Sequence, residues 1–339
     1  MSEWIRKSPL ASAGAIGVAL ILLSLITGFS QIKTEGLAWQ EAHYGPYLDA
    51  VVSGEASAPS QYRVLTNYAV VAAWRFAETL GIPRPMGSTF VALRLLLNLA
   101  LFALAFCFYR ALKIPSYTIV IGLSALAWAM TQSNYGSLLA LDAYTDILFY
   151  LLAALALVYR RPAWLVPIAV LAALNRETGF LIPIMALVAS LAAFDGNHSH
   201  RDLRRNGVLA LGLFVAIQLA LWLSFGIRTW ELHDSGATPG LSMLMHNLGN
   251  DAAWGHMAGT LGIVPLLALV SYRFWHPVLR PLCWTVVPIW VVGHLFTAPL
   301  EVSRVLLLPL VLLFIPGMLC GLAHSRNDVD SSAAAMVAS

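Results

Sequence analysis

Long apolar runs, separated by short charged or polar segments, cover most of the chain. We count ten, at residues 10–30, 89–109, 116–132, 146–159, 163–175, 178–194, 207–226, 257–272, 281–298 and 304–322. Because about 20 helical residues cross the hydrocarbon of a bilayer, this pattern predicts an all-α polytopic membrane protein with about ten transmembrane helices. The first run is longer than the apolar core of a cleavable signal peptide, so we expect it to remain as a span.

Two connections between the runs are long, at residues 31–88 and 227–256. In the first, residues 62–80 carry apolar side chains at helical spacing, which predicts a helix that lies in the membrane interface; a tilted span is the alternative. We expect residues 1–322 to form a single transmembrane domain. Residues 323–339 are small and polar, and we expect a disordered cytoplasmic tail there.

The positions of the charges predict the orientation. With the N-terminus in the cytoplasm, 12 of the 20 Lys and Arg residues fall on the cytoplasmic side, as the positive-inside rule requires. Both termini are then cytoplasmic, and both long connections lie outside. Twelve of the 17 Asp and Glu residues fall on or near the outer side. Since acids contribute little to topology, this asymmetry favours a functional outer face.

Composition narrows the class of protein. Charged residues make up 11% of the chain, hydrophobic residues 59%, and the mean hydropathy is +0.75. A soluble fold of this length cannot cover so much apolar surface, which excludes a soluble enzyme, a disordered chain and a nucleic-acid binder. The three cysteines, Cys107, Cys283 and Cys320, are scattered through apolar runs and fit core positions better than disulfides or a metal site.

Ionised groups interrupt the apolar pattern at its outer ends, where they are costly. Arg176 and Glu177 lie at the predicted tip of a hairpin of two short apolar arms; an Arg there suits a phosphate, and a helix-locking Arg–Glu or Arg–backbone contact is the alternative. Asp142 and Asp146, four residues apart, share one helix face. The two carboxylates repel each other unless a cation, a sugar or an Arg lies between them. The alternative is that they complement the positive end of the helix dipole at a helix N-terminus.

Two further charged groups map to the same side. Glu301 and Arg304 are spaced to form an intrahelical pair. The first long connection carries Glu41, His43, Asp49, Tyr62 and Arg63, for which an ordinary solvated loop is the alternative. Because all of these groups map to one membrane face, together they favour a functional site there.

Three short motifs carry a resemblance to a known class. They are Tyr62-Arg63-Val64-Leu65 at the end of the long first connection, Thr145-Asp146, and Asn175-Arg176-Glu177-Thr178-Gly179-Phe180-Leu181. In this order and sidedness the chain resembles bacterial integral-membrane glycosyltransferases of the GT-C class, which include the polyprenyl- and dolichyl-phosphate-sugar-dependent mannosyltransferases. The resemblance covers residues 1–195. It implies a GT-C-like fold in the bacterial cytoplasmic (inner) membrane.

The resemblance also implies a reaction. Such enzymes move a sugar from a polyprenyl-phosphate donor to the hydroxyl of a glycan or lipid acceptor at the outer, periplasmic face. Their base is a carboxylate of the first outer loop, usually an Asp, whereas this chain has Glu41-Ala42-His43-Tyr44 at that place and Asp49 further on. The candidate catalytic residues are therefore Glu41, Asp49 and His43. The candidate substrate-binding residues are Tyr62, Arg63, Asp142, Asp146, Arg176, Glu177, Glu301 and Arg304, with Arg63, Arg176 and Arg304 for the phosphate.

We expect no cofactor and no metal site, since His233, His246, His256 and His294 lack metal-ligand spacing, although Asp142 and Asp146 would suit a divalent cation. The expected partners are the lipid-linked sugar, its acceptor and membrane lipids, with no nucleic acid. A nucleotide-sugar donor is not expected, because the chain has no Gly-rich phosphate loop. A transporter or flippase, and a non-catalytic GT-C-like protein, are the alternatives. The mild mid-span polar residues disfavour a transporter.

Overall fold

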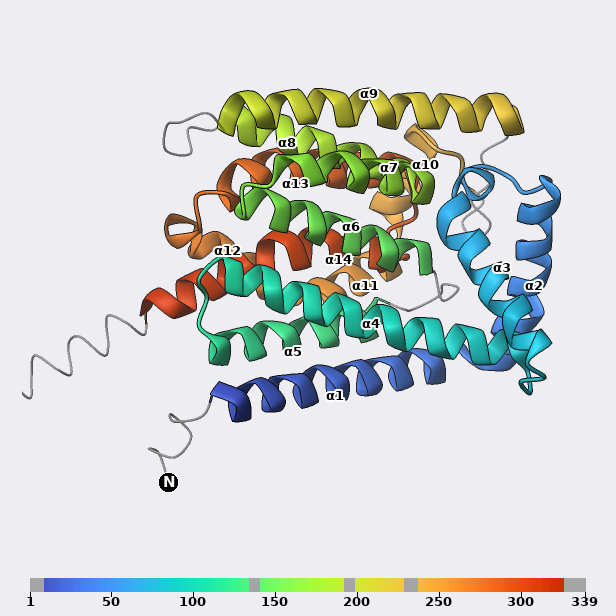
Figure 1. Ribbon diagram of the computed structural model, residues 1–339, viewed down its shortest axis with the longest axis horizontal. Coiled ribbons are helices and arrows are strands. Elements are labelled where there is room, and N and C mark those ends of the chain that lie inside the picture. Colours follow the sequence, from blue (N-terminus) through green and yellow to red (C-terminus); the bar gives the residue numbers. More distant parts are fainter. Residues whose placement is uncertain (1–8, 134–140, 192–198, 229–236, 326–339) are drawn as a thin grey trace, which may run out of the picture.

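The computed structural model describes residues 9–133, 141–191, 199–228 and 237–325, and this part of the chain is built from helices with no β-strand (Figure 1). The α-helices are α1 (Pro9–Glu35), α2 (Leu37–Ser53), α3 (Val64–Thr79), α4 (Pro85–Ala111), α5 (Ser116–Gln132), α6 (Leu141–Val158), α7 (Leu165–Asn175), α8 (Leu181–Leu191), α9 (Ser199–Phe225), α10 (Leu241–Gly249), α11 (Asp251–Leu261), α12 (Val264–Val270), α13 (Leu279–Thr297) and α14 (Leu307–Pro309). Short 3-10 segments are η1 (Ser60–Tyr62), η2 (Pro162–Trp164), η3 (Glu177–Phe180), η4 (Tyr272–Phe274) and η5 (Ser303–Leu306), and η6 (Leu310–Phe314) is a π-helical turn. The all-α prediction is confirmed.

Six helical segments of the described chain are long and apolar enough to cross a membrane. They are Gly14–Thr34, Pro85–Ala111, Leu141–Val158, His200–Phe225, Leu279–Thr297 and Ser303–Ser325, and the pair α11 and α12 would make a seventh. The protein therefore has the make-up of a membrane-embedded bundle. All ten predicted apolar runs fall on helices where the chain is described, but α5, α7 and α8 are shorter, so the number ten remains a prediction.

The predicted run at residues 257–272 is not one straight helix. It divides into α11 and α12, which are bent by 60° from each other. Gly262 ends α11 with a positive φ of 53°, and Pro265 lies in the first turn of α12, where its missing N–H has no helical partner to lose. These two residues break the span.

The helices differ sharply in how much of their surface is covered. The last helical segment, Ser303–Ser325, lies inside the bundle. At its π-helical turn, η6, Leu312 and Leu313 are fully buried. In contrast, α9 runs along one side of the bundle (Figure 1) and exposes Leu209, Leu213 and Leu223. Such a large apolar surface is costly in water, whereas lipid tails cover it without penalty.

Helices α2 and α3 stand at one end of the bundle, opposite the start of α1 and the end of the last helix (Figure 1). A small second core, separate from the main one, packs them against α4 and α6; its buried members are Tyr44, Leu48, Val70, Met86, Phe90 and Leu141. The helix predicted at residues 62–80 is found as α3, and its place in the membrane interface stays a prediction. The first long connection also holds α2, which ends at Gly54 in the left-handed conformation.

The other expected connections also contain helix. Residues 227–256 hold α10 and the beginning of α11. The last helix continues to Ser325, so residues 323–325 of the expected tail are helical, and the rest of that tail lies outside the described residues.

Candidate functional site

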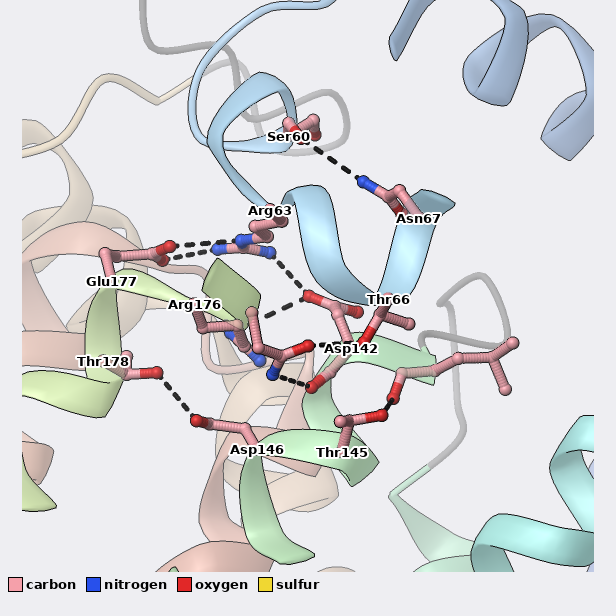
Figure 2. A network of polar contacts seen from close by, with 12 residues as sticks. Ser60, Arg63, Thr66, Asn67, Asp142, Thr145, Asp146, Arg176, Glu177 and Thr178 are labelled. Carbon is pink, nitrogen blue, oxygen red and sulfur yellow. Dashed lines mark hydrogen bonds and ion pairs between the residues drawn. The ribbon is translucent and has the colours of Figure 1, made fainter. Parts of the chain in front are cut away.

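The guanidinium group of Arg63, which directly precedes α3, binds two carboxylates from two other segments (Figure 2). Its Nε and Nη2 donate to Oε2 and Oε1 of Glu177 at 3.1 and 2.5 Å, and its Nη1 donates to Oδ2 of Asp142 at 2.9 Å. The planar fork of arginine favours this paired, charge-assisted arrangement. Arg63 therefore joins α3 to α6 and to the turn between α7 and α8.

A second arginine approaches the same carboxylate. Nε of Arg176 lies 3.7 Å from Oδ2 of Asp142, and the side chains of Arg63, Asp142 and Arg176 are only 16%, 13% and 11% exposed. Asp142 therefore lies between two cations. Of the arrangements that the Asp142–Asp146 spacing left open, the structure thus shows arginines at Asp142.

The tip of the hairpin positions Arg176 and Glu177. Helix α7 ends at Asn175, Arg176 is extended with φ −153° and ψ 149°, and η3 begins at Glu177. The turn closes tightly because Gly179 has no side chain: a Cβ there would lie 2.8 Å from Cβ of Ala172 and 3.1 Å from its carbonyl carbon and oxygen. The predicted hairpin at residues 175–178 is confirmed.

Asn175 connects the tip to α3 and α6. Its Nδ2 donates to the carbonyl oxygen of Asp142 at 3.0 Å, and its Oδ1 accepts from the hydroxyl of Thr66. Thr66 lies in the first turn of α3, three residues after Arg63, and both side chains contact the hairpin tip. Fully buried, Asn175 serves as a structural link between three segments.

Asp146 lies one turn along α6 from Asp142, on the same face, as its spacing predicts. It is 1% exposed, and its Oδ2 accepts from Thr178 Oγ1 at 2.7 Å. The hydroxyl of Tyr150 donates to the carbonyl oxygen of Thr178 at 2.6 Å. These two bonds fix Thr178, and with it the second half of the hairpin tip, to α6.

A cavity of about 410 Å³ opens beside this network. Its polar lining includes Arg63, Arg176, Glu177 and Arg304, which come from three segments far apart in the sequence. The remaining lining comes largely from α13, α8 and the turns before η1 and η5, and it is mostly apolar: Pro59, Phe180, Leu181, Ile289, Trp290, Ala298, Pro299, Val302 and Val305. The cavity thus combines a cationic end with apolar walls, as a site for an amphiphilic anion requires.

Arg63 and Glu177 lie outside the six candidate spans, and each keeps the other in its charged form. Burial disfavours the charge on Arg63, but the nearby carboxylates of Glu177 and Asp142 outweigh burial and raise the pKa of Arg63 above its usual value. Burial likewise disfavours the charge on Glu177, yet Arg63 and Arg176 outweigh it and lower the pKa of Glu177. Both groups are therefore charged at neutral pH.

Most of the predicted substrate-binding residues meet here. The network contains Arg63, Asp142, Asp146, Arg176 and Glu177, and Arg304 lines the same cavity.

Tyr62 and Glu301 are placed elsewhere. The hydroxyl of Tyr62 donates to the carbonyl of Gly226 at 2.8 Å and accepts from the backbone N–H of Arg228 at 3.0 Å. Glu301 lies in the turn before η5, so it does not share an α-helix with Arg304 as its spacing had suggested. Instead it pairs with His246 at 3.4 Å and accepts a hydrogen bond from the side chain of Asn250.

The three candidate catalytic residues all lie on α2 and do not line the cavity. Asp49 is exposed, and exposed His43 stacks on Trp39 and bonds to its carbonyl oxygen. Glu41 packs against Gly87 at the start of α4, where its Oε1 is buried with no hydrogen-bond partner in the described part of the chain. The roles assigned to these residues remain predictions.

Some residues of the site had no role in the sequence-based prediction. From the sequence, His294 was considered as a metal ligand and not expected to be one, and Thr66 was given no role. A signal for His294 was its spacing of four from Trp290, which places the two side chains on one face of α13. Nothing in the sequence pointed to Ser60, which lines the cavity.

Comparisons with protein-family models, with curated proteins and with solved structures find no match. Within the described residues, no group of three or more His, Cys, Asp or Glu side chains is arranged to hold a metal ion.

Proposed function

We propose that this protein is a membrane glycosyltransferase that moves a sugar from a polyprenyl-phosphate donor to the hydroxyl of a glycan or lipid acceptor. The proposal includes a GT-C-like bundle of about ten spans in the bacterial inner membrane. In this orientation both termini are cytoplasmic and the cavity faces the periplasm. The resemblance of the three sequence motifs to that class is consistent with it.

One observation carries the proposal: Arg63, Arg176 and Arg304 line a single cavity whose remaining walls are largely apolar. Negative charge builds up on the lipid phosphate as the bond to the sugar breaks, and fixed guanidinium groups stabilise that charge in a site poor in water. The apolar walls suit the first isoprene units of the lipid. A site for a small polar solute would not require both the arginines and the apolar walls.

The two carboxylates next to the arginines also fit this role. Glu177 and Asp142 hold the guanidinium of Arg63 in place before any ligand arrives. Such a held group loses little conformational entropy when a phosphate binds, so the site is prepared for the leaving group. The arrangement of Arg63, Arg176, Glu177 and Arg304 at the cavity, with Asp142 behind them, is therefore consistent with catalysis as well as with packing.

The test is a transfer assay with the purified protein in lipid nanodiscs. Polyprenyl-phosphate sugars with a radiolabelled hexose are supplied with a membrane lipid extract as acceptor, and both labelled product and released polyprenyl phosphate are measured. We expect Arg176→Ala and Arg304→Ala to reduce transfer by at least about 100-fold, as expected for loss of transition-state charge stabilisation.

The matched control is Arg75→Ala on α3, because that side chain is 57% exposed and pairs only with Glu78 among the described ion pairs. It should leave transfer unchanged. If Arg176→Ala and Arg304→Ala both retain wild-type transfer, or if the wild-type protein binds none of these donors, the proposal is wrong.

A further inference from the structure

The cavity contains one further group that is able to exchange a proton. His294, in the last turn of α13, lines the cavity and is 7% exposed. Its Nδ1 lies 2.8 Å from the carbonyl oxygen of Trp290, one turn earlier on the same helix. The two rings also contact each other, with centroids 4.4 Å apart, so the imidazole is held on two sides.

This hydrogen bond determines which nitrogen is basic. A carbonyl oxygen only accepts, so Nδ1 must carry the hydrogen and donate it to Trp290. In the neutral ring, Nε2 then has a free lone pair at the opposite edge of the imidazole. A backbone carbonyl that fixes the tautomer in this way is a common means of preparing a histidine to accept a proton.

The other titratable groups that line the cavity are poorly suited to this task. Arg63, Arg176 and Arg304 are cations, and Glu177 is bound by both arms of the Arg63 fork, with a pKa below its usual value. Asp142 and Asp146 lie behind them and are not part of the lining. Among the described residues of the lining, His294 is the titratable group that is neither a permanent cation nor part of the Arg63–Glu177 ion pair.

We infer that His294 is the general base of the transfer reaction, a role that rests on the proposed function. Nε2 takes the proton of the acceptor hydroxyl as the acceptor oxygen forms a bond to the anomeric carbon. The bond from that carbon to the phosphate oxygen breaks, and its electron pair stays on the polyprenyl phosphate beside the arginines. The proton then passes from the imidazolium to water.

The experiment compares His294→Gln with the wild-type protein in the nanodisc assay. Transfer at saturating donor should fall by about 10²–10⁴-fold, the usual contribution of a positioned base. The affinity for polyprenyl phosphate alone, measured by titration and native mass spectrometry, should stay within about twofold of wild type. Added imidazole should restore part of the transfer in His294→Ala, since a small base then occupies the space left by the ring.

The matched control is His200→Gln. His200 makes the same type of contact, from Nδ1 to the carbonyl oxygen of Ser190 at 2.9 Å, but it lies at the start of α9 and does not line the cavity. It should leave transfer unchanged.

The outcomes separate this inference from the proposed function. Wild-type transfer rates in His294→Gln, or a loss confined to donor affinity without imidazole rescue, would overturn the role of His294 and leave the glycosyltransferase in place. Binding of polyprenyl phosphate with no transfer from any donor by the wild-type protein would overturn both.

Discussion

At the scale of single residues, the site depends on how the partly buried charges of Arg63, Asp142, Arg176 and Glu177 are paired. The sequence left an Arg–Glu or Arg–backbone contact between helices as the alternative to a phosphate site at residues 176 and 177, and the structure shows an Arg–Glu contact of this kind from Glu177 to Arg63, more than a hundred residues earlier. Adjacent residues on a chain point in different directions, whereas a long arginine from another helix can reach the carboxylate with its fork. The sequence identified these charged residues as candidates because ionised groups are costly at membrane depth, but it did not show which of them pair.

Removing Arg63 should destabilise the fold more than removing an exposed arginine. Arg63→Met leaves two partly buried carboxylates without their main cation, which should cost about 1–3 kcal/mol. Arg75→Met, whose partner Glu78 is 36% exposed, should cost at most about 0.5 kcal/mol. Thermal unfolding in detergent would measure both, and the double variant Arg63→Met/Glu177→Gln should recover part of the loss. Equal unfolding temperatures for the two single variants would contradict this account.

The Arg63–Glu177 pair should also make stability depend on pH. The pKa of Glu177 is lower in the folded protein than its ordinary value of 4.5, so the folded state binds fewer protons than the unfolded state near that pH. The stabilisation from this group is complete above pH 4.5 and is lost as the pH falls below it, through the folded pKa. Unfolding temperatures between pH 7 and pH 3 should therefore drop less in Glu177→Gln than in wild type. Parallel curves would show that this pair contributes nothing.

At the scale of elements, the hairpin from α7 to α8 requires a glycine. Gly179→Ala would place a methyl group against the Cβ and backbone of Ala172, and backbone atoms cannot move aside cheaply. We expect a loss of about 1–3 kcal/mol in stability together with reduced transfer, since the same turn presents Arg176 and Glu177. Gly212→Ala in α9, with open space around it, is the control and should be neutral or slightly stabilising. Ala172→Gly should rescue Gly179→Ala in part, and no difference between the two alanine variants would refute the packing argument.

Tyr62 gives a second test at this scale, because the resemblance predicts substrate binding whereas its contacts indicate a tether. Its hydroxyl holds the η1 segment to the residues after α9 through two backbone groups. Tyr62→Phe should therefore cost about 1 kcal/mol and increase hydrogen exchange at residues 226–228, with donor affinity unchanged. A large loss of donor affinity with normal stability would instead support the substrate-binding prediction.

The elements themselves were predictable to different degrees. Continuous apolar runs identified the long helices, because an apolar run of about 20 residues is typical of a helix that crosses a membrane. Helix α2 was harder to predict, since its buried face includes Gln40 and Gly45 and its interior contains Pro46, so the usual apolar stripe is missing. The break at Gly262 was equally hidden, because a single glycine within an apolar run is compatible with a straight helix or with a bend.

At the scale of the whole molecule, the distribution of charge predicted which residues share a membrane face, and the structure places Arg63, Arg176 and Arg304 around one cavity. The sequence could not decide which residues of that face meet. Glu41 and Asp49 belong to the same loop as Arg63, but α2 packs through its Tyr44 side and leaves them outside the cavity. Tertiary packing determines which of these residues line the cavity, and it cannot be read from hydrophobic pattern and residue spacing.

The sidedness of the molecule is open to a direct test. Residue 75 lies on α3 and residue 113 lies in the turn between α4 and α5, at the other end of the 27-residue helix α4. Because a helix of that length is about 40 Å long, enough to cross a bilayer, we expect the two positions to lie on opposite sides of the membrane. In a variant with Cys107, Cys283 and Cys320 changed to Ala, Arg75→Cys should react with a membrane-impermeant maleimide in intact spheroplasts, and Lys113→Cys should react only after the membrane is opened. The reverse labelling would invert the orientation and place the cavity in the cytoplasm, and labelling of both cysteines in intact spheroplasts would show that α4 does not cross the membrane.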